Sequence, residues 1–535
     1  MDEATPSSGI GLNRPTLAAA AFIVGAGFLG SRLLGLVRSI VIAGTFGTSP
    51  EVGAFWVAFR LPDLIFQLLA GATVGAAFIP TFARLLNKDG EEAAWRLASS
   101  VLNLVGIATI IFAVLGFLFA PLLVPAIAPG LGDDTGQQQE LHALAVDLTQ
   151  LMMLSPILFS VSAMLTAILN ARQHFLWPAL APMVYNTAII VGALMFDDVH
   201  ALAAAVVIGA ALHLVVQVPA LFNVGMRYRA IARWRDAAVR EVGRLMGPRI
   251  IGLAAFQFGL IVTVFFASTV SDEAISAVTY AWLIVMTPLG LFGMAISTAV
   301  FPTMAEQAVV DRRDLRRTLD QSLRMIMFLT LPASAALIVL AEPLVASLFQ
   351  RAEFTEASTE ITAQALVFYA IGLCGHAAIE ILSRGFYSLS DTRTPVTYAV
   401  VGLVIATGLS ALLVQPMEVR GIALAVSAGA ITNATLLFWT LRGRLEWSDL
   451  RALGGSIGKT LVATVLMVEV VVLYLIVLDQ AGHLDTSRSA DAILALTGST
   501  VLGGISFFAA ARALSSEEAD TLLRRLPLPR RSFAS

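Results

Sequence analysis

Charged side chains are scarce in this chain. Only 13% of its 535 residues are Asp, Glu, Lys or Arg, and the mean hydropathy is +0.82. Soluble domains carry about a quarter of their residues as charged side chains, because polar groups must cover their surface. With 57% hydrophobic residues, the composition excludes a soluble globular protein and predicts an integral membrane protein.

Cysteine is nearly absent, since Cys374 is the only one. A single cysteine excludes an intramolecular disulfide and a cysteine-based metal site. The six histidines show no metal-ligand spacing, and no phosphate-binding loop of the Walker type occurs. We therefore expect no metal, no cofactor and no enzymatic activity.

Long apolar runs recur along the whole chain. Each contains about twenty residues, the length that a helix needs to cross a hydrocarbon core about 30 Å thick. The pattern predicts an all-α integral membrane protein with about fourteen transmembrane helices. The expected spans cover residues 17–45, 52–83, 97–122, 141–171, 178–196, 201–225, 246–268, 273–304, 322–344, 359–388, 396–415, 419–441, 459–479 and 491–513.

Basic residues are concentrated in alternate connections between these spans. Cytoplasmic loops retain Lys and Arg, so the asymmetry predicts the orientation and places both termini in the cytoplasm. We expect these residues to contact membrane lipids with anionic headgroups, and nucleic-acid binding is not needed to explain them. The basic residues of the predicted cytoplasmic connections are Arg84, Lys88, Arg96, Arg172, Arg227, Arg229, Arg233, Arg235, Arg240, Arg244, Arg312, Arg313, Arg316, Arg317, Arg393, Arg442, Arg444 and Arg451.

Two segments of the chain resemble each other at one fixed offset. The stretch 71–81, near the end of the second span, begins with glycine and ends in Pro-Thr, as does the stretch 293–303 near the end of the eighth. The repeat predicts two pseudo-symmetric six-helix lobes, a common plan for secondary transporters, and chance similarity between apolar helices is the alternative. The expected domains are an N-lobe at 1–225, a basic cytoplasmic linker at 226–245, a C-lobe at 246–445, helices thirteen and fourteen at 446–513 and a basic cytoplasmic tail at 514–535.

The first span carries arginines inside its apolar run. An ionised side chain near the bilayer centre costs about 2.5 to 3.5 kcal/mol, so it normally faces a wet cavity or a partner. Ser31, Gly35 and Arg38 share one helical face, and Arg32 and Ser39 flank it. This polar stripe predicts the wall of a cavity that receives an anion, with the glycine as a point where the helix bends.

The second span adds Arg60, Pro62 and Asp63. A proline inside a helix removes one backbone hydrogen bond, so we expect a kink there. The planar donor fork of arginine suits phosphate, and two or three arginines could hold a diphosphate, with Asp63 as a pairing partner. The alternative is an ion pair between Arg60 and Asp63, while Arg38 extends toward the outer interface.

Glu380 and Arg384 lie four residues apart in the tenth span. Side chains at this spacing meet on one face of a helix. We therefore expect an internal ion pair here rather than a cation site.

Five motifs, in matching order between about residues 30 and 441, resemble the MurJ (MviN) family of bacterial lipid II flippases. That family belongs to the multidrug/oligosaccharidyl-lipid/polysaccharide exporter (MOP) superfamily, whose members have V-shaped lobes. The motifs are Ser31-Arg32-Leu-Leu-Gly35-Leu-Val-Arg38, Ala58-Phe-Arg60-Leu-Pro62-Asp63, Ala77-Phe-Ile-Pro80, Phe349-Gln-Arg-Ala-Glu-Phe354 and Gly385-Phe-Tyr-Ser-Leu-Ser-Asp391-Thr-Arg-Thr-Pro395-Val.

The resemblance implies a function. It implies transport of the undecaprenyl-diphosphate-linked peptidoglycan precursor from the inner to the outer leaflet of the bacterial cytoplasmic membrane, with cell-wall synthesis proteins as expected partners. It also implies that Arg32 and Arg38 contact the diphosphate and that the last two helices form a groove for the lipid tail.

The chain departs from the usual family pattern at several cavity charges. Ser39 stands where an acid is usual, Phe66-Gln67 where an arginine pair is usual, and Leu283 and Met286 where an arginine and an acid are usual. Two alternatives therefore stay open. One is an exporter of another lipid-linked saccharide or a cation-coupled drug antiporter, and the other is a non-transporting scaffold of cell-wall synthesis.

Overall fold

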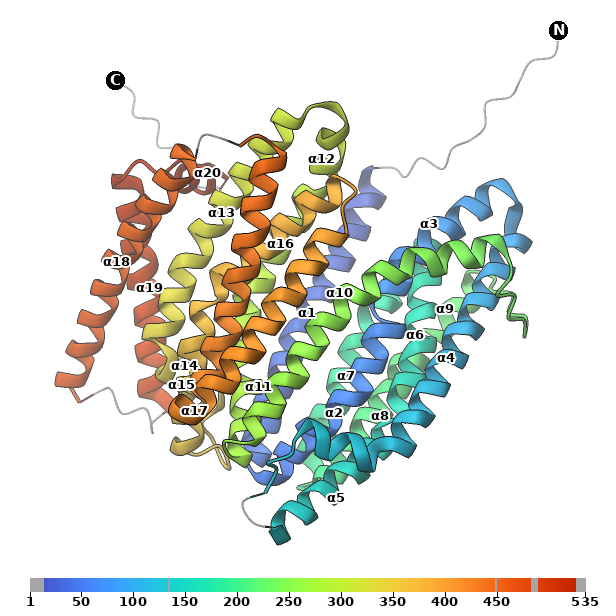
Figure 1. Cartoon of the computed structure of the whole chain (residues 1–535), viewed down its shortest axis with the longest axis horizontal. Coiled ribbons are helices and arrows are strands. Elements are labelled where there is room, and N and C mark those ends of the chain that lie inside the picture. Colours follow the sequence, from blue (N-terminus) through green and yellow to red (C-terminus); the bar gives the residue numbers. More distant parts are fainter. Residues whose placement is uncertain (1–13, 133–134, 448–449, 483–488, 526–535) are drawn as a thin grey trace. The chain divides into compact units, whose positions relative to one another are not determined.

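The computed structural model describes residues 14–132, 135–447, 450–482 and 489–525, and every regular element among them is helical (Figure 1). This confirms the all-α fold predicted from the sequence. The helices up to the middle of the chain are α1 (Arg14–Phe46), α2 (Pro50–Leu69), α3 (Ala72–Lys88), α4 (Gly90–Ile127), α5 (Thr135–Met152), α6 (Leu154–Ala171), α7 (Leu176–Met195), α8 (Val199–Val215), α9 (Val218–Asn223) and α10 (Ala237–Ser268). The remaining elements are α11 (Asp272–Pro288), the π-helix η1 (Leu289–Met294), α12 (Ala295–Val310), α13 (Arg312–Val339), α14 (Ala341–Phe349), α15 (Glu356–Ile371), α16 (Leu373–Ser388), α17 (Arg393–Arg444), α18 (Arg451–Gln480), α19 (Ser489–Ala513) and α20 (Glu517–Arg525).

The described helices include twelve that are long and apolar enough to cross a membrane, and the bent pair α15 and α16 provides one more candidate. Many of their apolar side chains face outward. In α4, for example, Ile111 and Leu122 are 53% and 68% exposed. A surface of this kind suits lipid rather than water, so the chain is a multi-pass membrane protein.

Helix α17 consists of two antiparallel arms. Its 52 residues would extend for about 78 Å as a straight helix, far more than one bilayer needs. The backbone leaves helical geometry at Glu418, where φ is 52°, and beyond it the chain returns along the first arm. A Cβ on Gly402 would lie only 2.8 Å from the carbonyl oxygen of Gly429. Two spans therefore share this label, and the described part of the chain contains the fourteen spans that hydropathy predicted.

Several spans that we expected to be continuous are interrupted. The expected span 359–388 breaks at Gly372, where α15 and α16 meet at 43°. Ser427 of α17 lies against this break and donates its hydroxyl to the carbonyl oxygen of Phe368 at 2.7 Å. Within 141–171 the break precedes Pro156, which has no N–H, and the Ser155 hydroxyl donates to the carbonyl oxygen of Met152 at 2.8 Å.

The second and eighth expected spans are interrupted as well. The second divides into α2 and α3, and α2 continues through Pro62 before the chain turns at Ala70 and Gly71. The eighth contains the π-helix η1, which follows Pro288. A π-segment of this kind accommodates an irregular backbone inside a longer helix.

Two compact units can be distinguished. Unit 1 comprises residues 1–42, 58–121 and 146–250, and unit 2 comprises 43–57, 122–145 and 251–535. This grouping follows spatial contacts, whereas the lobes and linker expected at 1–225, 226–245 and 246–445 were divided by the sequence repeat, and that division stays a prediction.

Each unit has its own apolar core. In unit 1, the ring of Phe82 lies 5.2 Å from that of Phe78 and 5.5 Å from that of Trp95, which joins α3 to α4. In unit 2, α18 and α19 pack against α13 (Figure 1). The rings of Phe328 and Phe507 lie 5.0 Å apart. These contacts attach the last two spans to the rest of unit 2.

Candidate functional site

The predicted anion site lies in unit 1, on α1, α2 and α7. Helix α1 carries Arg32 and Arg38, and α2 carries Arg60 and Asp63. The two arginines of α1 are six residues apart, which corresponds to a rise of about 9 Å and to faces that differ by about 120°. They therefore extend from different sides of the same helix.

A row of close contacts joins α1 to α7. A Cβ on Gly30 would lie 3.0 Å from the methyl group of Met183, and one on Gly35 would lie 4.0 Å from Oδ1 of Asn186. The Asn186 amide donates to the carbonyl oxygen of Ser31 at 3.5 Å and to that of Pro182 at 2.9 Å. Helix α7 thus packs against the glycine face of α1. The hinge role of Gly35 stays a prediction.

Arg38 is the clearest candidate for an anion contact. Its side chain is half-buried, and within the described residues its buried Nε has no hydrogen-bond partner. The Tyr185 phenol of α7 lies within electrostatic range of both Arg38 and Asp63. Three helices therefore contribute a cation, an acid and a phenol that interact electrostatically. A buried N–H donor without an acceptor is costly, so this place favours a ligand that supplies one.

Arg32 has a different environment. It is exposed, and its guanidinium lies 5.1 Å from the centre of the Phe28 ring on its own helix. Phe28 and its neighbour Leu29 are both 59% exposed. Arg32 is thus free to reach the headgroup of a lipid-linked ligand without sharing a position with Arg38.

Ser39 of α1 and Asp63 of α2 each form a hydrogen bond within their own helix. Ser39 is buried, and its hydroxyl donates to the carbonyl oxygen of Gly35 at 3.2 Å. The Gln67 amide donates to Oδ1 of Asp63 at 3.4 Å. Arg60 and Asp63 are both half-buried.

Aromatic and polar groups support this site from inside unit 1. The Phe159 ring lies 5.0 Å from the rings of both Phe66 and Tyr185 and 5.3 Å from the imidazole of His213. His213 Nδ1 is 2.6 Å from the Ser162 hydroxyl. Sequence reasoning missed Tyr185, although a tyrosine beside an intramembrane asparagine in a chain with only seven tyrosines was a usable signal.

The second predicted constellation lies in unit 2. Arg384 Nη1 is 3.0 Å from Oε2 of Glu380, and Nη2 donates to the Thr298 hydroxyl at 3.0 Å. Arg384 also donates to the hydroxyl of Ser297. The guanidinium therefore bridges α12 and α16. The carboxylate neutralises its charge inside the unit.

Comparison with solved structures defines the class of fold. A structure described as "Lipid II flippase MurJ, inward closed conformation" aligns with 94% of this chain and 100% of its own, with a TM-score of 0.76 and 21% identity. A multidrug resistance MATE family transporter of the MOP superfamily aligns with 78% of this chain and 95% of its own, with a TM-score of 0.63 and 18% identity. The chain has the fold of the MOP transporters.

The family follows from sequence comparison. The family model described as lipid II flippase MurJ matches residues 42–486. The lipid II flippase MurJ of Burkholderia cenocepacia is 34% identical over 425 residues, which cover 77% of this chain and 81% of that protein. A probable lipid II flippase MurJ of Thermotoga maritima is 31% identical over 447 residues, covering 84% and 89%. The chain belongs to the MurJ family, a family of transporters, and the identification from its motifs is confirmed.

The two arginines of α1 lie outside the residues that the family model matches. The match begins at residue 42, so Arg32 and Arg38 precede it. Their contact with a diphosphate is therefore still a prediction, supported by their position in unit 1 and by the environment of Arg38.

Proposed function

We propose that this protein is a flippase that moves the lipid-linked peptidoglycan precursor lipid II from the inner to the outer leaflet of the bacterial cytoplasmic membrane. Membership of the MurJ family is the observation that carries the proposal. The protein acts by alternating access, with both termini in the cytoplasm, and the transport step breaks no covalent bond. Cell-wall synthesis proteins are its expected neighbours in the membrane.

The diphosphate is the part of the precursor whose transfer through the bilayer costs the most free energy. A charged group at the membrane centre needs a wet cavity or an opposite charge. Arg38 offers a buried Nε donor, and its charge acts on the Tyr185 phenol together with that of Asp63. Arg32 offers an exposed guanidinium about two helical turns away. These arginines hold the diphosphate, and the apolar surfaces of α18 and α19 receive the polyprenyl tail.

The energy source for this step is the membrane potential. Moving one elementary charge through 100 mV is worth about 2.3 kcal/mol. A diphosphate carries negative charge, so its outward movement is favoured by a potential that is negative inside. No nucleotide hydrolysis is required.

Complementation tests the proposal. The parent chain should rescue growth when the resident lipid II flippase of a bacterium is depleted, and the Arg32→Ala and Arg38→Ala variants should not, at equal membrane abundance. Arg420→Ala is the matched control, because the one hydrogen bond of this exposed arginine within the described residues goes to the carbonyl oxygen of Met417, at 3.4 Å. If a well-expressed, correctly inserted parent fails, the proposal is wrong for this cargo.

An exporter of another lipid-linked saccharide, or a cation-coupled antiporter, is the second candidate, because MATE transporters share the fold. Cation coupling requires an ionisable acid in the membrane. Asp63→Asn and Glu380→Gln should abolish transport by an antiporter. A diphosphate flippase should depend more strongly on Arg32 and Arg38.

A further inference from the structure

The connection between α9 and α10 packs against α4 at a defined position along the axis of that helix. The Asn103 amide of α4 donates to the carbonyl oxygens of Arg229 and Ile231, at 3.2 Å and 2.8 Å, and Asn103 Oδ1 accepts from the Tyr228 hydroxyl at 3.0 Å. The backbone N–H of Arg229 donates to the Ser99 hydroxyl at 3.1 Å. This non-helical segment therefore has a fixed position in unit 1.

That position corresponds to the edge of the hydrocarbon core. One helical turn beyond Asn103, about 6 Å along α4, begins a series of exposed apolar side chains. The series includes Ile107, Ile110, Ile111, Val114, Leu118 and Leu122. In the other direction α4 starts with acids, and Glu92 accepts from Arg229 at 3.1 Å. The segment thus lies where apolar surface changes to charged surface, which is the depth of lipid headgroups.

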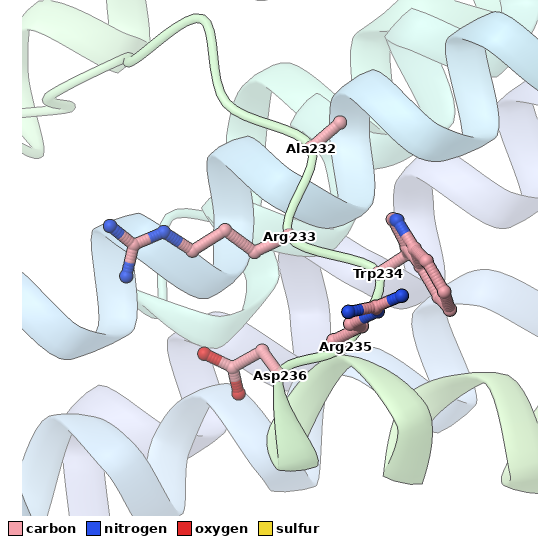
Figure 2. Close-up of a pocket in the computed structure, with 5 residues that line it drawn as sticks. All are labelled: Ala232, Arg233, Trp234, Arg235 and Asp236. Carbon is pink, nitrogen blue, oxygen red and sulfur yellow. The ribbon is translucent and has the colours of Figure 1, made fainter.

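Three exposed residues of this segment, Arg233, Trp234 and Arg235, form what we call the linker patch. The Arg235 guanidinium lies 4.6 Å from the centre of the Trp234 ring, while Arg233 extends to the other side of the backbone (Figure 2). Trp234 is 58% exposed. Together with Ala232 and Asp236, the patch lines an open hollow of about 410 Å³.

The charges of the patch are available to a ligand. Asp236 is the acid nearest in sequence, and its Oδ1 accepts the backbone N–H of Ala238 at 2.9 Å, at the start of α10. Among the described residues, neither Arg233 nor Arg235 forms an ion pair. Exposed arginines bind phosphate oxygens through paired N–H donors, and tryptophan prefers the membrane interface.

We propose that the linker patch binds the phosphate headgroup of an anionic phospholipid in the leaflet that it faces. Arg233 and Arg235 contact the phosphate, and the Trp234 ring lies at the level of the glycerol backbone. The excess of basic residues assigns this leaflet to the cytoplasmic side. A lipid fits better than a nucleic acid or an acidic protein, because Asn103 fixes the segment at headgroup depth. The site is separate from the transport site and does not depend on its cargo.

Lipid titration of the purified, full-length protein tests this site. Phosphatidylglycerol or phosphatidylcholine is added to the protein in neutral detergent, and bound lipid is counted by native mass spectrometry. The parent should bind phosphatidylglycerol more tightly than phosphatidylcholine. Each arginine near a membrane surface contributes about five-fold to affinity, so Arg233→Gln with Arg235→Gln should weaken phosphatidylglycerol binding about 30-fold. Arg420→Gln, which removes a charge from another loop, should leave binding unchanged.

Further variants separate the contributions of the charges and of the Trp234 ring. They also keep the test valid if the double variant misfolds. Replacing both arginines by lysine keeps the charge but removes the paired N–H donors, so it should retain only part of the affinity. Trp234→Ala should weaken phosphatidylglycerol binding although the charge is unchanged. If the double variant does not accumulate, each single Arg→Gln variant should still bind phosphatidylglycerol about five-fold more weakly than the parent. The proposal is overturned if the double variant binds phosphatidylglycerol as Arg420→Gln does, if the two lipids bind equally, or if inorganic phosphate at the same concentration competes with the lipid.

Discussion

Arg444, at the end of α17, places its Nη1 2.6 Å from Oδ2 of Asp391, in the turn that precedes the same helix. The two residues meet because the arms of α17 fold back on each other. Partial burial raises the pKa of Asp391, but hydrogen bonds from Thr394, from Arg444 and from the backbone N–H of Arg393 outweigh burial and lower the pKa to about 2. The ion pair therefore closes the open end of this hairpin.

Replacing Asp391 should separate the effect of its charge from that of its hydrogen bonds. Asp391→Ala removes the acceptor for two backbone N–H groups at the start of α17 and should lower the free energy of unfolding by about 1–2 kcal/mol. Asp391→Asn retains an acceptor oxygen and should cost less. Thermal unfolding of the purified variants at neutral pH measures both, and equal losses would contradict this account.

The same carboxylate predicts a pH dependence. Its folded pKa of about 2 is lower than the usual unfolded value of about 3.9. The stabilisation is therefore fully present above about pH 4 and is lost as the pH falls through about 2. The difference in melting temperature between the parent and Asp391→Asn should shrink over this interval. A constant difference would show that the charge of Asp391 contributes nothing.

Arg38 should contribute more to lipid II translocation than its positive charge alone would. Loss of a hydrogen bond to a charged group costs about 1.5–3 kcal/mol, so Arg38→Ala should reduce lipid II translocation about ten- to hundred-fold in reconstituted vesicles. Arg38→Lys keeps the charge but lacks an Nε donor and the planar fork, and should recover only part of the rate. Full recovery with lysine would assign the residue a purely electrostatic role.

The pair of Glu380 and Arg384 should show strong coupling. Glu380→Leu leaves the guanidinium of Arg384 without its counter-charge in the interior of unit 2 and should cost about 2 kcal/mol, a moderate value because both side chains are partly exposed. The double variant with Arg384→Met removes both charges and should be more stable than Glu380→Leu. A double-mutant cycle of unfolding free energies measures this coupling, and additive losses would refute it.

Two glycines of unit 2 should respond in opposite directions to alanine. At Gly372 a Cβ would lie 2.6 Å from Oγ and 2.7 Å from Cα of Ser427, so Gly372→Ala should destabilise the break between α15 and α16 by about 1–3 kcal/mol. At Gly408 nothing lies within 4 Å of the added Cβ. Gly408→Ala should therefore raise the melting temperature, because alanine favours helix by about 1 kcal/mol. Melting temperatures of both variants in the same detergent provide the comparison.

Hydropathy predicted the spans well because a lipid-exposed backbone has almost no alternative to the helix. The interruptions were harder to predict, because the break at Gly372 depends on a neighbour that is distant in the sequence. Ser427, which stabilises the break at Gly372, is 55 residues away in the sequence. The break before Pro156 had a local signal, the missing N–H, but proline alone does not decide whether a helix ends, since α2 continues through Pro62.

The candidate site was only partly predictable for a related reason. Helical periodicity put Ser31, Gly35 and Arg38 on one stripe, but it could not show that α7 covers Gly35 through Asn186. Nor could it show that Tyr185 approaches Arg38 and Asp63. These relations depend on how separate helices pack, and one sequence carries no direct record of that packing.

The hairpin of α17 also bears on how the protein is made. Its arms are in backbone contact at Gly402 and Gly429, and only a short polar turn with Glu418 and Arg420 joins them. In the orientation that the basic residues predict, this turn must cross the bilayer with its charges during biosynthesis. Two apolar arms that are already paired can leave the insertion channel as one body, so the hydrocarbon admits them together and the turn crosses once. We therefore expect the tenth of the chain that forms this hairpin to insert as a single unit rather than as two independent signals.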